Sequence, residues 1–221
     1  MTSRGRKILF SGASLLLALA AGLFILVEQT RVSADAIRTS VTRTDDLINK
    51  AWSLPVAATF ERKVTWQSNP SMCGPASVVN IQRSMTASRI SERSVLKGTG
   101  LCWSGFCWMG LTLNELAVVA KTKTRRSVSV LRDLTPEEFK EHLKRANNTD
   151  RRYIINFNRA AIFGAGAGHH SPIGGYLEAE DLVFVLDVNR DYRPWLIERA
   201  RLFAAMDTFD GERKRGLLLI Q

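Results

Sequence analysis

The sequence holds three cysteines and three histidines, and one of the cysteines has the surroundings of a nucleophile. Cys73 lies in "QSNPSMCGPAS", between a turn and the predicted start of a helix. A thiol attacks a carbonyl carbon as the thiolate, and the unpaired N–H groups and dipole at a helix N-terminus lower the thiol pKa. Cys73 is therefore placed to be a reactive thiolate, and the competing interpretation is a small, inert side chain buried in a helix.

A thiolate nucleophile needs a base, and the candidates are His142, His169 and His170. His142 lies in the charged pattern "EEFKEHLKR", which predicts an exposed position on a helix. His169 and His170 follow the glycine-rich "GAGAG" and precede Ser-Pro, where a strand is predicted to begin. A loop that delivers an imidazole to this point suits general base chemistry. We take His169 as the base and keep His170 as the alternative.

Two further residues complete a candidate site. Asp187 ends the apolar run "LVFVLD", where its carboxylate could fix the tautomer of an imidazole and stabilise the imidazolium. Gln67 could donate its side-chain amide to an oxyanion, with the backbone N–H of Cys73 as the second donor. The alternatives are an ordinary turn residue for Asp187 and a surface polar residue for Gln67.

These residues must be positioned by helices in the first half of the domain and strands in the second. Capping and periodicity predict helices over residues 73–85, 112–122 and 135–146, the first capped by Ser71. Strands are predicted at "RYIINFN", "HSPIGGYL", "LVFVLDV" and "GLLLI", with a short helix within "WLIERARLFAAM". This order predicts an α+β domain in which a helical layer packs against an antiparallel sheet.

The N-terminus has the pattern of a membrane-directed segment. Arg4, Arg6 and Lys7 precede an uncharged run over residues 8–27, about the length that crosses a bilayer. Apolar residues continue past a potential cleavage site at 18–20, which favours an uncleaved anchor over a removed signal, and a buried helix of the fold is the competing interpretation. The basic tail predicts an exported domain.

We therefore divide the chain into a membrane anchor or signal segment over 1–30, a linker or helical stalk over 31–58 and a catalytic domain over 59–221. The expected location is periplasmic, either anchored in the inner membrane or released after cleavage. The net charge of +10 is scattered without interleaved aromatic residues, so we expect no nucleic-acid binding. An acidic small substrate or an anionic membrane surface fits this charge equally well.

An odd number of cysteines in an exported protein suggests one disulfide and one free thiol. Cys102 and Cys107 lie close together in "GLCWSGFCWMG", so their pairing is expected and Cys73 stays reduced. A metal site on Cys102 and Cys107 is the alternative, but no histidine or further cysteine lies nearby to complete it. We predict no metal site.

Three motifs in order, "QSNPSMCGPAS", "GHHSPIGGY" and "VFVLDVNRDYRPW", resemble those of the phytochelatin synthase family, within the papain-like cysteine peptidase group. The resemblance runs from about Phe60 to Met206. It implies a papain-like fold and these roles: nucleophile Cys73, oxyanion donor Gln67, base His169, orienting acid Asp187, and substrate contacts from Arg159, Gly168 and Ser171. The family usually has an aromatic or aliphatic residue where this chain has His170.

The resemblance implies cleavage of the Cys–Gly bond of glutathione through a γ-Glu-Cys thioester on the nucleophile. Transfer to water makes the enzyme a hydrolase, and transfer to a second glutathione makes phytochelatin. The 221 residues hold no counterpart of the cysteine-rich tail of plant members, so hydrolysis is expected to dominate, as in short bacterial members. No tightly bound cofactor is implied, although cadmium or another thiophilic metal bound to glutathione could stimulate the reaction.

Two other classes of function remain open at this point. One is a papain-like peptidase or amidase that acts on another exported peptide. The other is a noncatalytic module that binds thiols or metal through its three cysteines. Glutathione and the inner membrane are the expected partners, and a homodimer is left open.

Overall fold

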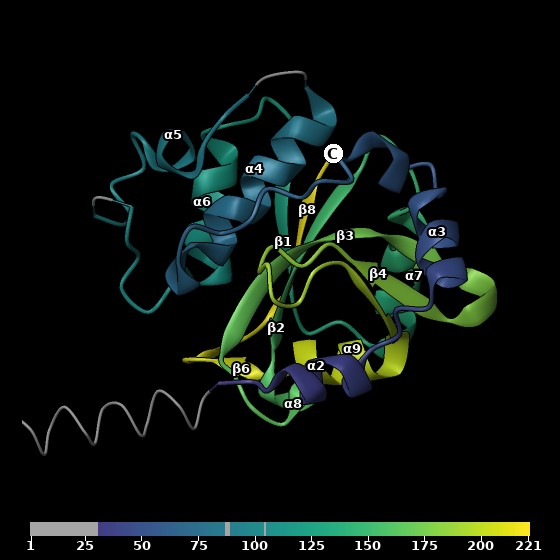
Figure 1. Ribbon diagram of the computed structural model, residues 1–221. Helices are drawn as coiled ribbons and strands as arrows, with labels where there is room; N and C mark the ends of the chain where they lie inside the picture. Colours follow the sequence, from purple (N-terminus) through teal and green to yellow (C-terminus); the bar gives the residue numbers. More distant parts are fainter. Residues whose placement is uncertain (1–30, 87–88, 104) are drawn as a thin grey trace, which may run out of the picture.

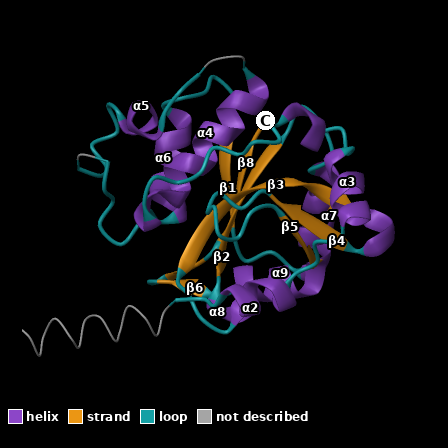
Figure 2. Cartoon of the chain, in the orientation of Figure 1, coloured by secondary structure: helices purple, strands orange, loops and turns teal. Residues whose placement is uncertain are grey.

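The computed structural model describes residues 31–86, 89–103 and 105–221. In these ranges an antiparallel sheet of six strands runs through the molecule in the order β1-β8-β2-β3-β4-β5 (Figure 2). The strands are β1 (Val128–Leu131), β2 (Arg152–Asn158), β3 (Gly168–Leu177), β4 (Leu182–Val185), β5 (Trp195–Glu198) and β8 (Gly216–Ile220). The short strands β6 (Phe209–Asp210) and β7 (Arg213–Lys214) pair separately. The predicted α+β class is confirmed.

Helices cover both faces of this sheet. In Figure 1, α4, α5 and α6 form one group, whereas α2, α8 and α9 gather at the lower edge. The helices are α2 (Ala34–Ser40), α3 (Asp45–Trp52), α4 (Cys73–Met85), α5 (Glu92–Leu96), α6 (Leu113–Lys121), α7 (Pro136–Arg145), α8 (Ala160–Phe163) and α9 (Arg199–Met206). Single 3-10 turns occur at η1 (Ala57–Thr59), η2 (Pro70–Met72) and η3 (Glu178–Glu180).

The predicted capping boxes fix the starts of α6 and α7. Thr112 accepts from the backbone of Glu115, which reaches back in turn, and Thr135 and Glu138 repeat the pattern. Helix α4 begins at Cys73 as predicted, but Ser71 does not cap it. The turn η2 runs directly into α4, so the cap moves upstream to Asn69, whose side chain accepts from the Ser71 N–H.

Apolar residues fill both sides of the sheet, which explains why the strands read as nearly continuous apolar runs. Ile154 and Phe184 face α3, α4 and α6 within one core cluster. Ile155, Phe157 and Val183 point the other way, into a second cluster with α7 and α9. A sheet buried on both faces is a rigid support for residues at the ends of its strands.

The segment 31–58 is part of this packed body, which corrects the expected linker or stalk. Thr42 pairs with Leu196 of β5 in an isolated bridge, and Trp52 is buried with its ring edge-on to Phe184, 5.1 Å between centroids. Ala51 and Trp52 at the end of α3 join the core cluster on this face of the sheet. No helix in the described ranges is long and apolar enough to span a bilayer, and the predicted span over 1–30 lies outside them.

Candidate active site

The start of α4 brings Cys73 against strand β3. Cys73 is the first residue of the helix, buried to 5% exposure, and keeps a free thiol. Ser77, one turn along, has its hydroxyl 2.8 Å from the Cys73 carbonyl oxygen and 3.1 Å from that of His170. This hydroxyl ties the beginning of the helix to the strand that carries both candidate bases.

His169 connects the thiol to a buried carboxylate. Its Nε2 lies 3.0 Å from Oδ1 of Asp187, and its ring packs edge-on to Phe157 across the strand pair. With Nε2 held by the carboxylate, Nδ1 is the ring nitrogen left to serve the thiol. The structure thus holds His169 against Asp187 and couples its charge to Cys73, and the catalytic roles of the three residues stay a prediction.

Asp187 lies just past the end of β4 and is completely buried among donors. Besides His169, it accepts from the guanidinium of Arg159 at 2.8 and 2.9 Å, from Trp195 Nε1 at 3.1 Å and from the Asn189 N–H at 2.9 Å. Burial alone would raise the pKa of the Asp187 carboxyl, but the charges of Arg159 and His169 outweigh it and hold that pKa well below its usual range. This residue is a fixed anion.

The electrostatics of the pair favour a charged thiolate and imidazolium. Burial opposes ionisation of Cys73, yet the charge and hydrogen bond of His169, followed by those of His170, hold the thiol pKa well below its usual value. For His169, burial and Arg159 lower the pKa, whereas Asp187 and Cys73 raise it, and the net shift is upward. Each shift favours the charged form of its group, as a cysteine nucleophile with its base requires.

Gln67 lines a cavity of about 410 Å³ together with Pro70, Gly168 and His169. Its backbone N–H donates to Val188, and its side-chain amide donates to the Asn69 carbonyl at 3.0 Å. The amide oxygen is buried and has no hydrogen-bond partner among the described residues. The amide nitrogen has a second hydrogen to offer, so the geometry allows the predicted oxyanion role.

The predicted substrate contacts have different surroundings. Arg159 is buried, and its guanidinium is bound to Asp187 and stacked on the Tyr192 ring, 3.4 Å from the centroid, so it supports the carboxylate. Gly168 borders the cavity at the start of β3. Ser171 is fully buried, and its hydroxyl has no partner in the described part of the chain.

Sequence reasoning missed a polar cluster beside Gly168. The Arg215 guanidinium lies 3.0 Å from Asp210 and donates to Asn156 at 3.3 Å, and the Asn156 amide donates to Asp210 at 3.0 Å. A Cβ on Gly168 would lie 2.8 Å from this guanidinium, so the glycine makes room for it. The signal in the sequence that could have indicated this cluster is Asn156, a polar residue within the apolar strand "RYIINFN", whose amide is fully buried.

His142 stands apart from the site. It is half-buried on α7, with Nδ1 3.2 Å from the hydroxyl of Tyr153 and its ring edge-on to that tyrosine. The expectation of an exposed residue is corrected, because Phe139 and Ala146, three residues before and four after His142, are buried in the core and His142 lies at the border of that face of α7.

The predicted disulfide between Cys102 and Cys107 is formed. The loop that it closes touches the segment before the nucleophile: Asn69 donates to the Gly105 carbonyl at 3.1 Å, and the Cys107 N–H donates to Ser71 at 3.1 Å. This disulfide loop, residues 102–107, therefore supports the turn from which α4 starts.

A family model described as phytochelatin synthase matches residues 27–217, which is most of the chain. The protein belongs to the phytochelatin synthase family. Among its relatives is glutathione gamma-glutamylcysteinyltransferase 2 of Arabidopsis thaliana, 29% identical over 70% of this chain and 37% of the relative. Glutathione gamma-glutamylcysteinyltransferase 1 of Triticum aestivum is 30% identical over 70% of this chain and 33% of the relative. The chain thus spans between a third and two fifths of these two relatives.

Solved structures place this phytochelatin synthase-like chain in the papain fold. The peptidase domain of Streptococcus ComA aligns with a TM-score of 0.50 and 14% identity, over 72% of this chain and 96% of that domain. A putative C39-like peptidase from Bacillus anthracis aligns with a TM-score of 0.53 and 11% identity, over 73% and 96%. At these identities the likeness concerns the fold alone, and it confirms the predicted papain-like architecture.

Proposed function

We propose that this protein cleaves the Cys–Gly bond of glutathione and forms a γ-Glu-Cys thioester on Cys73. The observation that carries the proposal is the buried Cys73–His169–Asp187 arrangement within a domain of the phytochelatin synthase family. The names of the relatives support glutathione as the donor.

In the acylation step, the Cys73 thiolate attacks the carbonyl carbon of the Cys–Gly bond. The Gln67 amide and the backbone N–H of Cys73 would hold the oxyanion as the carbonyl becomes tetrahedral. The His169 imidazolium then gives its proton to the glycine nitrogen, the C–N bond breaks, and glycine leaves. Asp187 keeps the imidazole oriented throughout.

In the second step the thioester passes to one of two acceptors. His169, now neutral, takes a proton from water or from the α-amino group of a second glutathione as that group attacks the thioester carbon. The C–S bond breaks and the thiolate of Cys73 is restored. Water yields γ-Glu-Cys, and glutathione yields a chain longer by one γ-Glu-Cys unit. Resemblance to short bacterial members favours water as the main acceptor.

The polar cluster of Arg215, Asp210 and Asn156 suits the γ-glutamyl end of the substrate. That group carries an α-carboxylate and an α-amino group, which need a cation and an anion respectively. Arg215 and Asp210 offer both beside Gly168. We therefore propose Arg215 as a second carboxylate contact beside Arg159, which lines the cavity although its guanidinium is bound to Asp187.

We also propose that the protein works without a tightly bound cofactor and that cadmium acts through the glutathione thiol.

For the location, we propose that the domain is periplasmic and tethered by residues 1–30. The disulfide supports an oxidising compartment. Membrane fractionation with protease protection of intact and permeabilised cells tests the location. Recovery of the full chain in the soluble cytoplasmic fraction would contradict it.

The deciding experiment is mass spectrometry of the purified, reduced full chain incubated with glutathione, with and without cadmium, beside Cys73→Ala. We expect glycine together with γ-Glu-Cys or its oligomers from the wild type and neither from the variant. The ratio of dipeptide to oligomer separates hydrolase from synthase. Absence of glycine release from the folded wild type would remove glutathione as the substrate, and a screen of peptide substrates would then test the peptidase alternative.

A further inference from the structure

A second imidazole lies against the nucleophile. His170 follows His169 on β3, and its Nδ1 is 3.8 Å from the Sγ of Cys73. It is almost completely buried, at 3% exposure. The strand pairing sets His170 opposite Asn156 and His169 opposite Phe157, so the two imidazoles approach the thiol from different faces of the strand.

Within the part of the chain that the structure describes, the rest of the His170 ring makes no polar contact that would give it a purely structural role. Its Nε2 is buried and has no hydrogen-bond partner among the described residues. On the Nδ1 side, a Cβ on Gly74 would lie 3.8 Å from the ring and would also meet Leu111 and Leu116, so apolar side chains pack close to this nitrogen. A structural histidine normally satisfies both ring nitrogens, and a buried unpaired nitrogen requires an explanation.

We infer that His170 is a positioning residue for the thiolate: its Nδ1–H donates to Sγ of Cys73, on the side that His169 does not occupy. Placing the proton on Nδ1 leaves Nε2 as a bare acceptor, so no buried N–H of this ring is left unpaired. This inference rests on the proposed function only in taking Cys73 as the nucleophile.

His169 and His170 have different roles because their surroundings differ. His169 is tied to Asp187 and so becomes the imidazolium that moves a proton. His170 has no carboxylate partner in the described ranges; Asn156, its cross-strand neighbour, is hydrogen-bonded to Arg215 and Asp210, which are paired with each other. His170 is thus placed to donate to the thiolate without taking part in the proton transfer that His169 carries out.

The thiolate has to be stable at two points, before it attacks glutathione and again when it leaves the thioester. A better stabilised thiolate is also a better leaving group. A second donor therefore helps most where sulfur leaves, and its loss is expected to slow breakdown of the thioester more than its formation.

The test is the pH dependence of Cys73 alkylation by iodoacetamide in the folded full chain, which needs no glutathione and so stands apart from the proposed function. In His170→Phe, which carries the kind of residue usual in the family, we expect alkylation at pH 6 to fall by about tenfold and the profile to move to higher pH. In His170→Asn, whose amide can donate from nearly the same place, we expect most of the rate to return. His142→Phe is the matched control and leaves the profile unchanged.

His169→Asn provides the second comparison. We expect this variant to keep part of its low-pH alkylation, and the double variant with His170→Phe to behave as an ordinary thiol. If the profile of His170→Phe coincides with that of the wild type, the inference is overturned. If that variant fails to fold, the ¹⁵N resonance of His170 Nδ1 in the wild type decides: it shifts on alkylation of Cys73 if the bond exists, and an unchanged resonance overturns the inference.

Discussion

Asp187 shows how one buried carboxylate can serve both chemistry and stability. It orients His169 and also neutralises the buried guanidinium of Arg159. Asp187 therefore affects the reaction through His169 and the stability of the fold through Arg159. A substitution that keeps its size but removes its charge should affect both properties at once.

We expect Asp187→Asn to lower glycine release by about a hundredfold or more. The His169 imidazolium would lose the anion that stabilises it, and the neutral ring would no longer be held in the required tautomer. The same change leaves Arg159 as an unpaired buried cation, which should cost about 3–5 kcal/mol of unfolding free energy. Kinetics and urea denaturation measure the two effects. Asp207→Asn, on a half-buried pair with Lys214, is the control. Full activity in Asp187→Asn would exclude His169 as the oriented base.

The pH dependence of the reaction follows from the opposite shifts at Cys73 and His169. The thiol pKa is lowered by His169 and His170 against burial, and the His169 pKa is raised by Asp187 and Cys73 against burial and Arg159. Activity needs the charged form of each group, so it is lost in acid as the thiolate protonates and in base as the imidazolium deprotonates. We expect a broad plateau across neutral pH in kcat/KM. A maximum confined to pH above 8, as for an unperturbed thiol, would contradict this pairing.

At this scale the sequence placed Cys73, His169 and Asp187 in one candidate site because each lies at the end of a recognisable element. The engagement of Arg159 by Asp187 was not predictable, because it requires the end of β2 to meet the end of β4 across β3. Arg215 lies in the charged run "ERKRG", and nothing in that run indicates a buried position. Only the pairing of β8 with β2 carries it to Asn156 and Gly168.

Among the elements, those with local signals were predicted and those that depend on distant pairing were missed. Helices α6 and α7 begin at capping boxes that can be read directly from the sequence. In "WLIERARLFAAM" the first four residues form β5 and the helix begins afterwards, because β5 completes the sheet beside β4. The insertion of β8 between β1 and β2 joins the two ends of the domain, and no local pattern indicates it.

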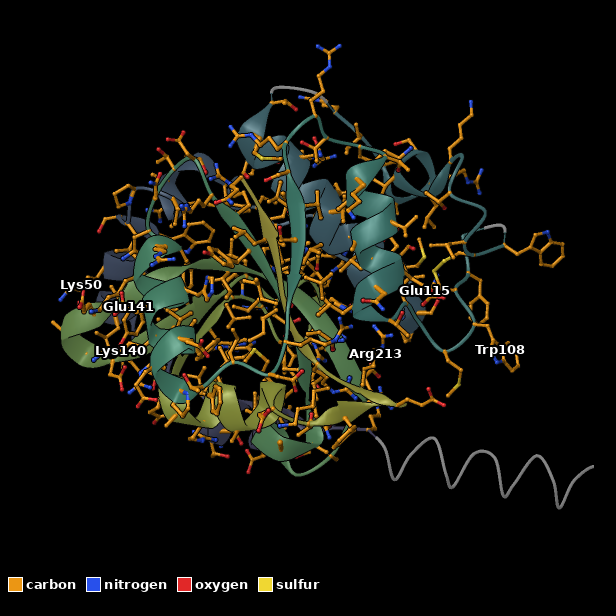
Figure 3. All side chains as sticks on the ribbon, turned by 180° about the vertical axis from the view of Figure 1, so that it is seen from behind. Lys50, Trp108, Glu115, Lys140, Glu141 and Arg213 are labelled. Carbon is orange, nitrogen blue, oxygen red and sulfur yellow. A yellow bond between two sulfur atoms is a disulfide. The ribbon has the colours of Figure 1, made fainter. Side chains whose placement is uncertain are left out.

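The disulfide loop gives a prediction at the scale of elements. Converting Cys102 and Cys107 to serine should cost about 2 kcal/mol of unfolding free energy, as expected for a short closed loop. Because residues 102–107 hold Asn69 and Ser71 in place before α4, kcat/KM should also fall several-fold. Trp108→Ser is the control: this side chain is 83% exposed and projects away from the body in Figure 3. A double variant with wild-type kinetics would show that the loop does not support the site.

At the scale of the whole molecule, the site depends on a domain that is larger than its motifs. Cys73 comes from the helical side, whereas His169 and Asp187 come from the sheet, so their geometry holds only while the two layers stay packed. Helix α3, upstream of every motif, adds Ala51 and Trp52 to the core on the side of α4. The boundary at residue 59 that the motifs suggested would cut through this core.

We therefore expect residues 31–221 to fold and residues 59–221 to fail. Removing 31–58 uncovers Phe184 and breaks the bridge between Thr42 and Leu196, and the loss should approach the 5–15 kcal/mol that typically stabilises a domain. Trp52→Ala in the full chain isolates the largest part of this effect, about 3–5 kcal/mol, and Val118→Ser, at a partly exposed position on α6, is its control. Thermal unfolding followed by near-UV circular dichroism compares the chains. A cooperative transition in 59–221 at the temperature of 31–221 would show that α2 and α3 are an appendage and return the boundary to residue 59.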